Sequence, residues 1–307
     1  MPQHNRQTIY ESITQRIVGE LEQGRVPWVQ PWGTPEVDTP LGLPRNASTT
    51  NSYSGINILI LWGAAIKHGR RTQNWLTFKQ ALALGGCVRK GEKATTVVYA
   101  DRFVPKKEHA KAQDSGDDPQ AIPFLKRYSV FNADQCDGLP DDIFAGAAPL
   151  PDSEAIPLAE DLIVATGADV RIGGDRAFYV PAHDYVQVPP QPAFRAQIDY
   201  YRTCFHELGH WSGHERRLAR SFKGRFGSKP YAREELVAEL ASAFVCATLQ
   251  IVPTVRHADY IAAWLDLLRE DDRAIFHAAS QASKAADFVL AFQAAEAGGE
   301  QKEGAAA

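Results

Sequence analysis

Cysteine is scarce in this chain of 307 residues, and long apolar segments are missing. The four cysteines are scattered and form no Cys-x-x-Cys pair: Cys87, Cys136, Cys204 and Cys246. We therefore expect neither a disulfide scaffold nor a cysteine-rich zinc site. We expect the cysteines to be buried, reduced thiols. The longest mostly apolar run, residues 56–66, is too short to span a bilayer, and the N-terminus shows no signal segment. These absences predict a cytoplasmic protein with no membrane partner.

The feature richest in chemistry is His206-Glu207-Leu208-Gly209-His210. Residues four apart share one face of a helix, so both imidazoles can hold one metal ion, with Glu207 beside them. This is the H-E-x-x-H arrangement of zinc hydrolases. Residues 200–205 contain no Pro or Gly and lead into the motif as helix.

A third ligand is expected from a second helix, over residues 234–244, where Glu235 and Glu239 share a face. In thermolysin-like peptidases a later helix supplies the third ligand, and a second carboxylate one turn on holds a ligand histidine. By that pattern Glu235 binds the metal and Glu239 orients a histidine, although the reverse assignment stays open. His214 is a rival ligand, but on an unbroken helix it would lie about 12 Å from His206. It is therefore interpreted as a helix-end histidine.

Three protein ligands leave one coordination position for water, whose pKa a metal lowers toward neutrality. Glu207 is the expected general base for attack on a carbonyl and the carrier of a proton to the leaving amine. Tyr231, just before the second helix, is the candidate partner for the oxyanion. Residues 177–180 and 184–188 alternate like strands, and an edge strand beside the metal could pair with a peptide.

Charge is distributed unevenly along the chain. Residues 1–111 contain 15 Lys+Arg against 8 Asp+Glu, a balance of +7, and residues 112–307 contain 18 against 29, a balance of -11, which together give the total of -4. A basic first part and an acidic second part indicate different partners.

The basic part alternates cations with aromatic rings, a pattern that suits single-stranded nucleic acid, because cations follow phosphates and bases stack on rings. The alternative is that the aromatics are core and the cations ordinary surface, and for Trp62 the core is preferred. The candidate DNA-binding residues are Trp28, Trp32, Arg45, Tyr53, Asn57, Arg70, Arg71, Trp75, Lys79, Arg89, Lys90 and Lys93.

The pattern of segments predicts an α+β protein of two domains. Residues 1–140 form a small α/β domain that begins with a capped helix after Thr8 and ends with two strands, over 93–104 and 122–131. Residues 141–157, rich in Ala, Pro, Gly and Asp, are the expected linker. Residues 158–293 form the metal-site domain, and residues 294–307 are an expected disordered tail.

The whole chain resembles the ArdC-type antirestriction proteins of conjugative plasmids. In the first part the resemblance rests on residues 53–57 (YSGIN), 75–80 (WLTFKQ), 88–93 (VRKGEK) and 130–132 (VFN). In the second part it rests on residues 205–211 (FHELGHW) and 231–239 (YAREELVAE). The chain departs from the family's pattern at Ser54, where a basic residue is common.

The resemblance implies a domain that binds single-stranded DNA, followed by a zincin-like metallopeptidase domain of the gluzincin type. It also implies protection of incoming plasmid DNA from host restriction endonucleases during conjugation. Two functions remain open: a protein that shields DNA by occluding it, or a peptidase that DNA binding brings to DNA-bound proteins. The nitrogen and oxygen ligands suit Zn2+ but also accept Mn2+ or another divalent transition metal.

Overall fold

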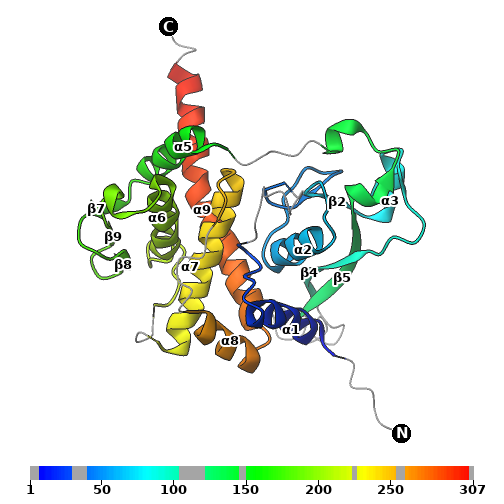
Figure 1. Ribbon diagram of the computed structural model, residues 1–307, viewed down its shortest axis with the longest axis horizontal. Helices are drawn as coiled ribbons and strands as arrows, with labels where there is room; N and C mark the ends of the chain where they lie inside the picture. Colours follow the sequence, from blue (N-terminus) through cyan, green and yellow to red (C-terminus); the bar gives the residue numbers. More distant parts are fainter. Residues whose placement is uncertain are drawn as a thin grey trace, which may run out of the picture.

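The computed structural model describes residues 7–29, 40–103, 122–144, 150–222, 227–253 and 260–303, and within these it leaves aside the side chains of residues 101–103, 122–124 and 294–303. Figure 1 shows two lobes side by side, with helix α1 at the foot of their boundary. We call residues 40–144 the N-terminal lobe and residues 150–303 the C-terminal lobe. Both contain helices and strands, which confirms the predicted α+β class.

The N-terminal lobe is built on a four-stranded sheet of order β1-β2-β5-β4, which contacts helix α2, and a small sheet of β3 and β6. Strands β4 and β5 form a long antiparallel pair, as the alternating sequence predicts. The elements are α1 (Ile9–Glu22), β1 (Arg45–Asn46), α2 (Ile56–Lys67), β2 (Asn74–Leu76), α3 (Phe78–Ala83), β3 (Cys87–Val88), β4 (Thr95–Phe103), β5 (Ile122–Asn132), η1 (Ala133–Gln135), β6 (Cys136–Asp137) and η2 (Asp141–Phe144).

The C-terminal lobe packs helices around α7, with a three-stranded sheet of order β7-β9-β8 against α6. Its elements are α5 (Asp152–Ala165), β7 (Asp169–Ile172), β8 (Phe178–Val180), β9 (Tyr185–Val188), η3 (Gln191–Ala193), α6 (Gln197–Trp211), α7 (Lys229–Thr248), α8 (Ile261–Glu270) and α9 (Ala274–Glu303). The strands and helices predicted around the metal motif are all present.

Helix α1 belongs to the N-terminal sequence but packs on the C-terminal lobe. A capping box starts it: the Thr8 hydroxyl accepts from the amide of Glu11 at 3.1 Å, and the Glu11 carboxylate accepts from the amide of Thr8 at 2.8 Å. Its apolar face meets α8. Trp28, just after the helix, stacks edge-on against Trp264 of α8 with ring centroids 5.6 Å apart. The first residues of the chain therefore belong to the N-terminal part by sequence but to the C-terminal lobe by packing.

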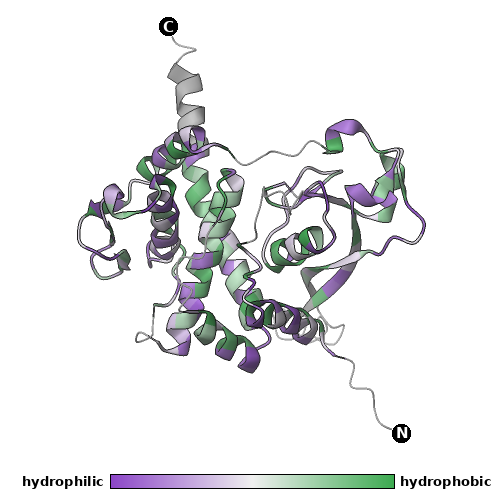
Figure 2. Cartoon of the chain, in the orientation of Figure 1, coloured by the Kyte–Doolittle hydropathy of each residue, from purple (hydrophilic) through white to green (hydrophobic). Residues whose placement is uncertain are grey.

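A single large hydrophobic core crosses the boundary between the lobes. Trp62 of α2 lies edge-on against Phe244 of α7, with centroids 5.8 Å apart, so the expectation that Trp62 is a core residue is confirmed. Figure 2 shows apolar residues concentrated on α2, α7 and α9, where the lobes meet. Within the described ranges, no helix is both long and apolar enough to cross a bilayer.

Three details differ from the sequence expectations. Residues 152–157 of the expected linker already form the first turns of α5, in which Asp152 and Glu154 stand near the positive end of the helix dipole. Helix α9 continues through residues 294–303 of the expected disordered tail, because Ala and Glu are strong helix formers. Cys87 is exposed on the small β3–β6 sheet, while the other three cysteines are buried as expected.

Replacing Trp28 by Ala should destabilise the whole protein. Its indole is fully buried, and removing a buried Trp costs about 3–5 kcal/mol. Because the core is shared, urea unfolding should show one transition that shifts as a unit. Phe78→Ala is the control, since Phe78 is 49% exposed and should shift stability by less than about 0.5 kcal/mol. Equal effects of the two substitutions would contradict this packing.

Candidate metal centre

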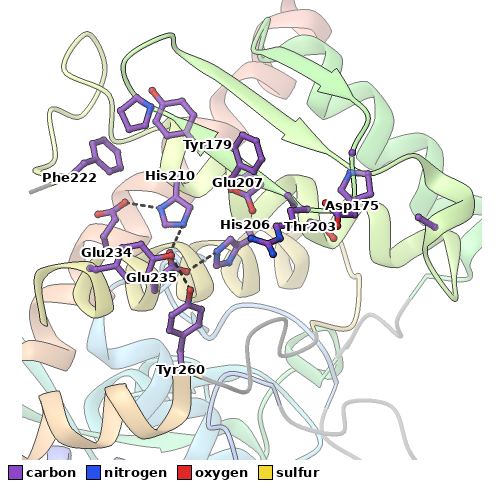
Figure 3. A pocket seen from close by; sticks show the side chains of 18 of the residues that line it. Asp175, Tyr179, Thr203, His206, Glu207, His210, Phe222, Glu234, Glu235 and Tyr260 are labelled. Atoms are coloured by element: carbon purple, nitrogen blue, oxygen red, sulfur yellow. Dashed lines mark hydrogen bonds and ion pairs between the residues drawn. The ribbon is translucent and has the colours of Figure 1, made fainter. Parts of the chain in front are cut away.

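Helix α6 places His206, Glu207 and His210 together in the interior. All three side chains are buried, and the two imidazole rings lie 5.0 Å apart between centroids. The spacing of four residues puts them one turn apart on one face, as the sequence predicts. Figure 3 shows both rings turned toward α7, with the Glu207 side chain in the same hollow.

Glu235 of α7 reaches both imidazoles. Its Oε2 lies 3.4 Å from Nε2 of His206 and its Oε1 lies 3.5 Å from Nε2 of His210. One ligand atom from each of these three residues lies within 4.8 Å of the other two. Ligands bonded tetrahedrally at about 2.0–2.1 Å are separated by about 3.4 Å. The three donors therefore stand where a tetrahedral divalent ion would have its ligands.

Each histidine has a second carboxylate behind it. Nδ1 of His206 lies 3.4 Å from Glu239, and Nδ1 of His210 lies 3.3 Å from Glu234. Such partners orient a ligand imidazole and leave Nε2 for the ion. Glu239 thus stands behind His206, in the orienting position preferred in the sequence analysis.

Glu234 is a residue that the sequence analysis missed. It is anchored by Arg220, which donates to its two oxygens at 2.8 and 3.2 Å and to the carbonyl of Gly209 at 2.6 Å. The only sequence signal was its position next to Glu235. Adjacent helical residues point about 100° apart, so periodicity placed it away from the metal.

A close contact between α6 and α7 brings the donors together. Gly209 packs against Ala238, and a Cβ added at Gly209 would stand 3.1 Å from the Cα of Ala238. The approach of the two helices therefore favours glycine at the fourth position of the motif, because an added Cβ would force its neighbour to shift by a few tenths of an ångström. A larger side chain there would move the carboxylate of Glu235 away from the imidazoles.

The charges of this centre call for a cation. Four glutamates are buried here: Glu207, Glu234, Glu235 and Glu239. Burial lowers the pKa of His206, but Glu235 and Glu239 outweigh it and raise that pKa to about 9. Burial also lowers the pKa of His210, but hydrogen bonds to Glu234 and Glu235 outweigh it and raise that pKa to about 10. Carboxylates that stabilise protons on both imidazoles would also stabilise a divalent ion, so the residues fit the metal.

The centre opens into a cavity of about 1000 Å³. One wall comes from residues 174–179, which include edge strand β8, and the other from the start of α7 and Tyr260. Its aromatic lining residues are Phe178, Tyr179, Phe194, Phe222, Tyr231 and Tyr260. A peptide entering this cavity would pass both His206 and Glu207.

Tyr231 lines this cavity, as a partner for an oxyanion must. Its hydroxyl lies 2.9 Å from the hydroxyl of Tyr260, a residue that the sequence did not point to. Burial raises the pKa of Tyr231, and the neighbouring Tyr260 and Glu235 raise it further. The phenol therefore stays protonated and able to donate a hydrogen bond.

His214 is separate from the metal donors. Helix α6 ends at Trp211, and the His214 ring lies near the carboxylate of Asp184, at 4.0 Å. It is absent from the group of His206, His210 and Glu235, the one described cluster with metal-ligand spacing. The helix-end interpretation is consistent with this position.

Comparison with known proteins matches both parts of the chain. Residues 7–131 match the N-terminal domain of the anti-restriction factor ArdC, and residues 157–281 match a zincin-like metallopeptidase. Crystal structures of ArdC from plasmid R388, one metal-free and one bound to Mn(II), are 38% identical, with TM-scores of 0.77 and 0.75. Each alignment covers 93% of this chain and 98% of the other.

This chain belongs to the ArdC antirestriction family. It is also 40% identical, over 93% of its length, to uncharacterized protein y4eC of Sinorhizobium fredii, of which it covers 92%. DNA primase TraC of Escherichia coli is 38% identical over 94% of the chain, but the chain spans only 27% of that primase. The predicted two-domain architecture with a zincin-like second domain is confirmed.

Two of the aromatic residues proposed to stack on DNA, Trp28 and Trp75, are not available for it. Trp28 and Trp75 are 0% and 1% exposed, so their assignment as DNA-binding residues in this ArdC-family chain is wrong: both fill the core. Tyr53 is half-buried against the small core that contains Trp75. Trp32 lies outside the described residues. Sequence could not separate these cases, because core and stacking aromatics occur in the same patterns.

Some of the polar DNA-binding candidates are held by ion pairs or hydrogen bonds, and the others are exposed. Arg70 pairs with Glu92 at 3.4 Å, Arg71 with Asp134 at 2.8 Å, and Arg89 with Glu92 at 3.1 Å. The Asn57 amide binds both backbone groups of Val98, at 2.7 and 2.9 Å, and therefore holds β4 in place. The remaining candidates are exposed: Arg45, Lys79, Lys90 and Lys93.

Substitutions can separate the metal ligand from the orienting carboxylates. Glu235→Gln should abolish tight binding of Zn2+ and Mn2+, because it removes a ligand charge. Glu239→Gln and Glu234→Gln should weaken binding about 10- to 100-fold. Calorimetric titration of metal-free protein measures all three, with exposed Glu215→Gln as the control. Full binding by Glu235→Gln and none by Glu239→Gln would reverse the assignment.

Proposed function

We propose that this protein binds single-stranded DNA, protects incoming DNA from restriction endonucleases, and carries a divalent-metal peptidase centre. The peptidase part is supported above all by Glu235 standing between the Nε2 atoms of His206 and His210. The Mn(II)-bound structure of the R388 relative supports a divalent ion as the metal. Two nitrogen ligands and one oxygen ligand make Zn2+ the first expectation and Mn2+ the second.

A bound divalent ion supplies a Lewis acid that polarises a peptide carbonyl. His206, His210 and Glu235 would hold it, while Glu239 and Glu234 keep the imidazole rings oriented. Glu207, in the same cavity, takes a proton from the attacking water and returns it to the leaving amine. Tyr231, whose raised pKa keeps it protonated, donates a hydrogen bond to the developing oxyanion.

An extended polypeptide is the substrate class that suits this cavity. Among the described strands, β8 pairs with β9 and leaves its other edge facing the cavity. A peptide can add to such an edge through main-chain hydrogen bonds. The aromatic lining favours a large apolar side chain next to the cleaved bond.

The antirestriction role needs a way to reach DNA, which the basic first part provides. With 15 Lys+Arg against 8 Asp+Glu in residues 1–111, it attracts phosphates. The described aromatic residues that are exposed on the N-terminal lobe include Phe78, Tyr99 and Tyr128, at 49%, 59% and 46%. We assign base stacking to this exposed set in place of the buried tryptophans.

Occlusion of DNA is the preferred explanation of the protective effect, because covering a strand needs no turnover. The second candidate is a peptidase that cleaves DNA-bound proteins. It is favoured by the intact Glu207, since a purely structural ion would need no general base.

Glu207→Ala distinguishes these candidates. The variant should keep its metal and DNA affinity but lose peptide cleavage by at least about 100-fold, since general-base catalysis contributes that much. A peptide library measures cleavage, and conjugation into a restricting host measures protection. Exposed Glu215→Ala is the matched control.

The occlusion model predicts full protection by Glu207→Ala. Protection lost together with cleavage, while Glu215→Ala is unaffected, would favour the DNA-bound peptidase. Cleavage that persists in Glu207→Ala would contradict the proposed role of this glutamate.

DNA binding should weaken steeply with salt. Each phosphate neutralised contributes a slope of about -0.7 to log affinity against log salt for single strands. The full chain should be used, because α1 packs against α8 and a fragment of residues 1–140 would lose that support. Fluorescence anisotropy with labelled oligo(dT) measures the slope. No binding at low salt would refute the DNA-binding proposal.

A further inference from the structure

A second cavity, of about 770 Å³, lies between α1, α2 and the start of β4. We call it the basic cleft. Its cations come from four separate places: Arg16 on α1, Arg25 after it, Lys67 at the end of α2, and Arg127 on β5. All four belong to exposed residues, but the Arg16 guanidinium is partly buried: it donates to the carbonyl of Ile60 at 3.3 Å, and burial lowers its pKa. Segments far apart in sequence thus present positive charge to one hollow.

Negative charge in the basic cleft is small. Glu20 is the one acidic residue among its described lining residues, and it already pairs with Arg25 at 2.6 Å. Burial and the neighbouring Arg70 and Lys67 lower the pKa of His68, which lines the same cleft. Burial is the larger cause of this shift, and Lys67 is the neighbour that belongs to the cleft.

Neutral hydrogen-bond donors accompany the cations. Ser12, Thr95, Thr96 and Gln7 also line the basic cleft. Hydroxyl, amide, Arg and Lys side chains are the groups that bind phosphate and sugar oxygens. The deeper lining is aliphatic, including Ile13, Ile17 and Leu59, so the cleft offers phosphate contacts rather than a platform for stacked bases.

This charge contrasts with that of the arginines first suspected from sequence. Arg70, Arg71 and Arg89 each lie against a carboxylate, so their charge is largely neutralised. In the basic cleft, four cations face one carboxylate. A phosphate chain is therefore attracted more strongly to the cleft than to the paired arginines.

We propose that the basic cleft holds the sugar-phosphate backbone of single-stranded DNA. This inference rests on the proposed DNA-binding function and names the surface that performs it. A recessed cavity suits one flexible strand, whereas a duplex is read by elements inserted into its grooves. Contacts to phosphates carry no sequence information, which suits a protein that must shield DNA of any sequence.

Two triple variants with equal loss of charge test the proposal. The cleft variant carries Arg16→Gln, Lys67→Gln and Arg127→Gln. The comparison variant, called the control variant, carries Lys79→Gln, Lys90→Gln and Lys93→Gln. These are the exposed lysines that the sequence suggested for DNA binding, and they lie outside the cleft, so the pair of variants tests one surface against the other. Binding of labelled oligo(dT) to each full-length protein is measured from low to high salt, with melting temperature as the check on folding.

In a plot of log affinity against log salt, the slope of the cleft variant should be shallower than that of wild type by about 2, since three phosphate contacts contribute about 0.7 each. At 0.1 M salt its affinity should be about 100-fold below wild type, and the difference should vanish near 1 M. The control variant should retain most of the wild-type slope. If the triple variant does not fold, Lys67→Gln and Arg127→Gln singly should each remove about 0.7.

Different failures point to different errors. A wild-type protein that binds no oligo(dT) refutes DNA binding itself. A wild type that binds, with loss confined to the control variant, overturns the basic cleft alone. A duplex of equal length that binds as tightly, and is lost in the cleft variant, overturns the single-strand assignment. Inorganic phosphate that binds the cleft without competing with oligo(dT) overturns it as a DNA surface.

Discussion

The close approach of α6 and α7 at Gly209 and Ala238 is the constraint on which the metal centre depends. With 3.1 Å between a would-be Cβ and the facing Cα, no larger residue fits without moving one helix. That approach brings Glu235 of α7 to the two imidazoles of α6 and places Glu239 and Glu234 behind them. The H-E-x-x-H motif therefore specifies a helix contact as well as two ligands, because its glycine lies between them.

The buried charge of this centre explains its elaborate support. Four carboxylates in the interior would be costly without cations to offset them. Arg220 neutralises part of that charge and ties the chain after α6 to Glu234. The imidazoles and a divalent ion, held by His206, His210 and Glu235, would offset the rest. The orientation of His210 thus depends on a residue outside both helices, which links metal affinity to the packing of the segment that follows the motif.

The two lobes are coupled by their common core. Helix α1 contributes Arg16 to the basic cleft and also packs against α8, whose preceding residue, Tyr260, lines the cavity at the metal centre. The basic cleft and the metal centre are thus parts of one packed body. Under the proposed function, this arrangement would hold the metal-centre cavity at a constant distance from a DNA strand in the cleft.

Local sequence was sufficient for the elements and for the chemistry of the motif: the capping box at Thr8, the strands over β4 and β5, and the pairing of His206 with His210 all follow from spacing along the chain. The preference for Glu235 over Glu239 also came from helical spacing combined with a known pattern. Glu234, Tyr260 and the basic cleft did not, because their partners come from distant segments. Trp28 and Trp75 show the same limit, since a ring that stacks on a base and a ring that fills a core have the same local sequence. Only the packing of α1, α2, α7 and α8 decided which of these side chains are buried and which are exposed to solvent.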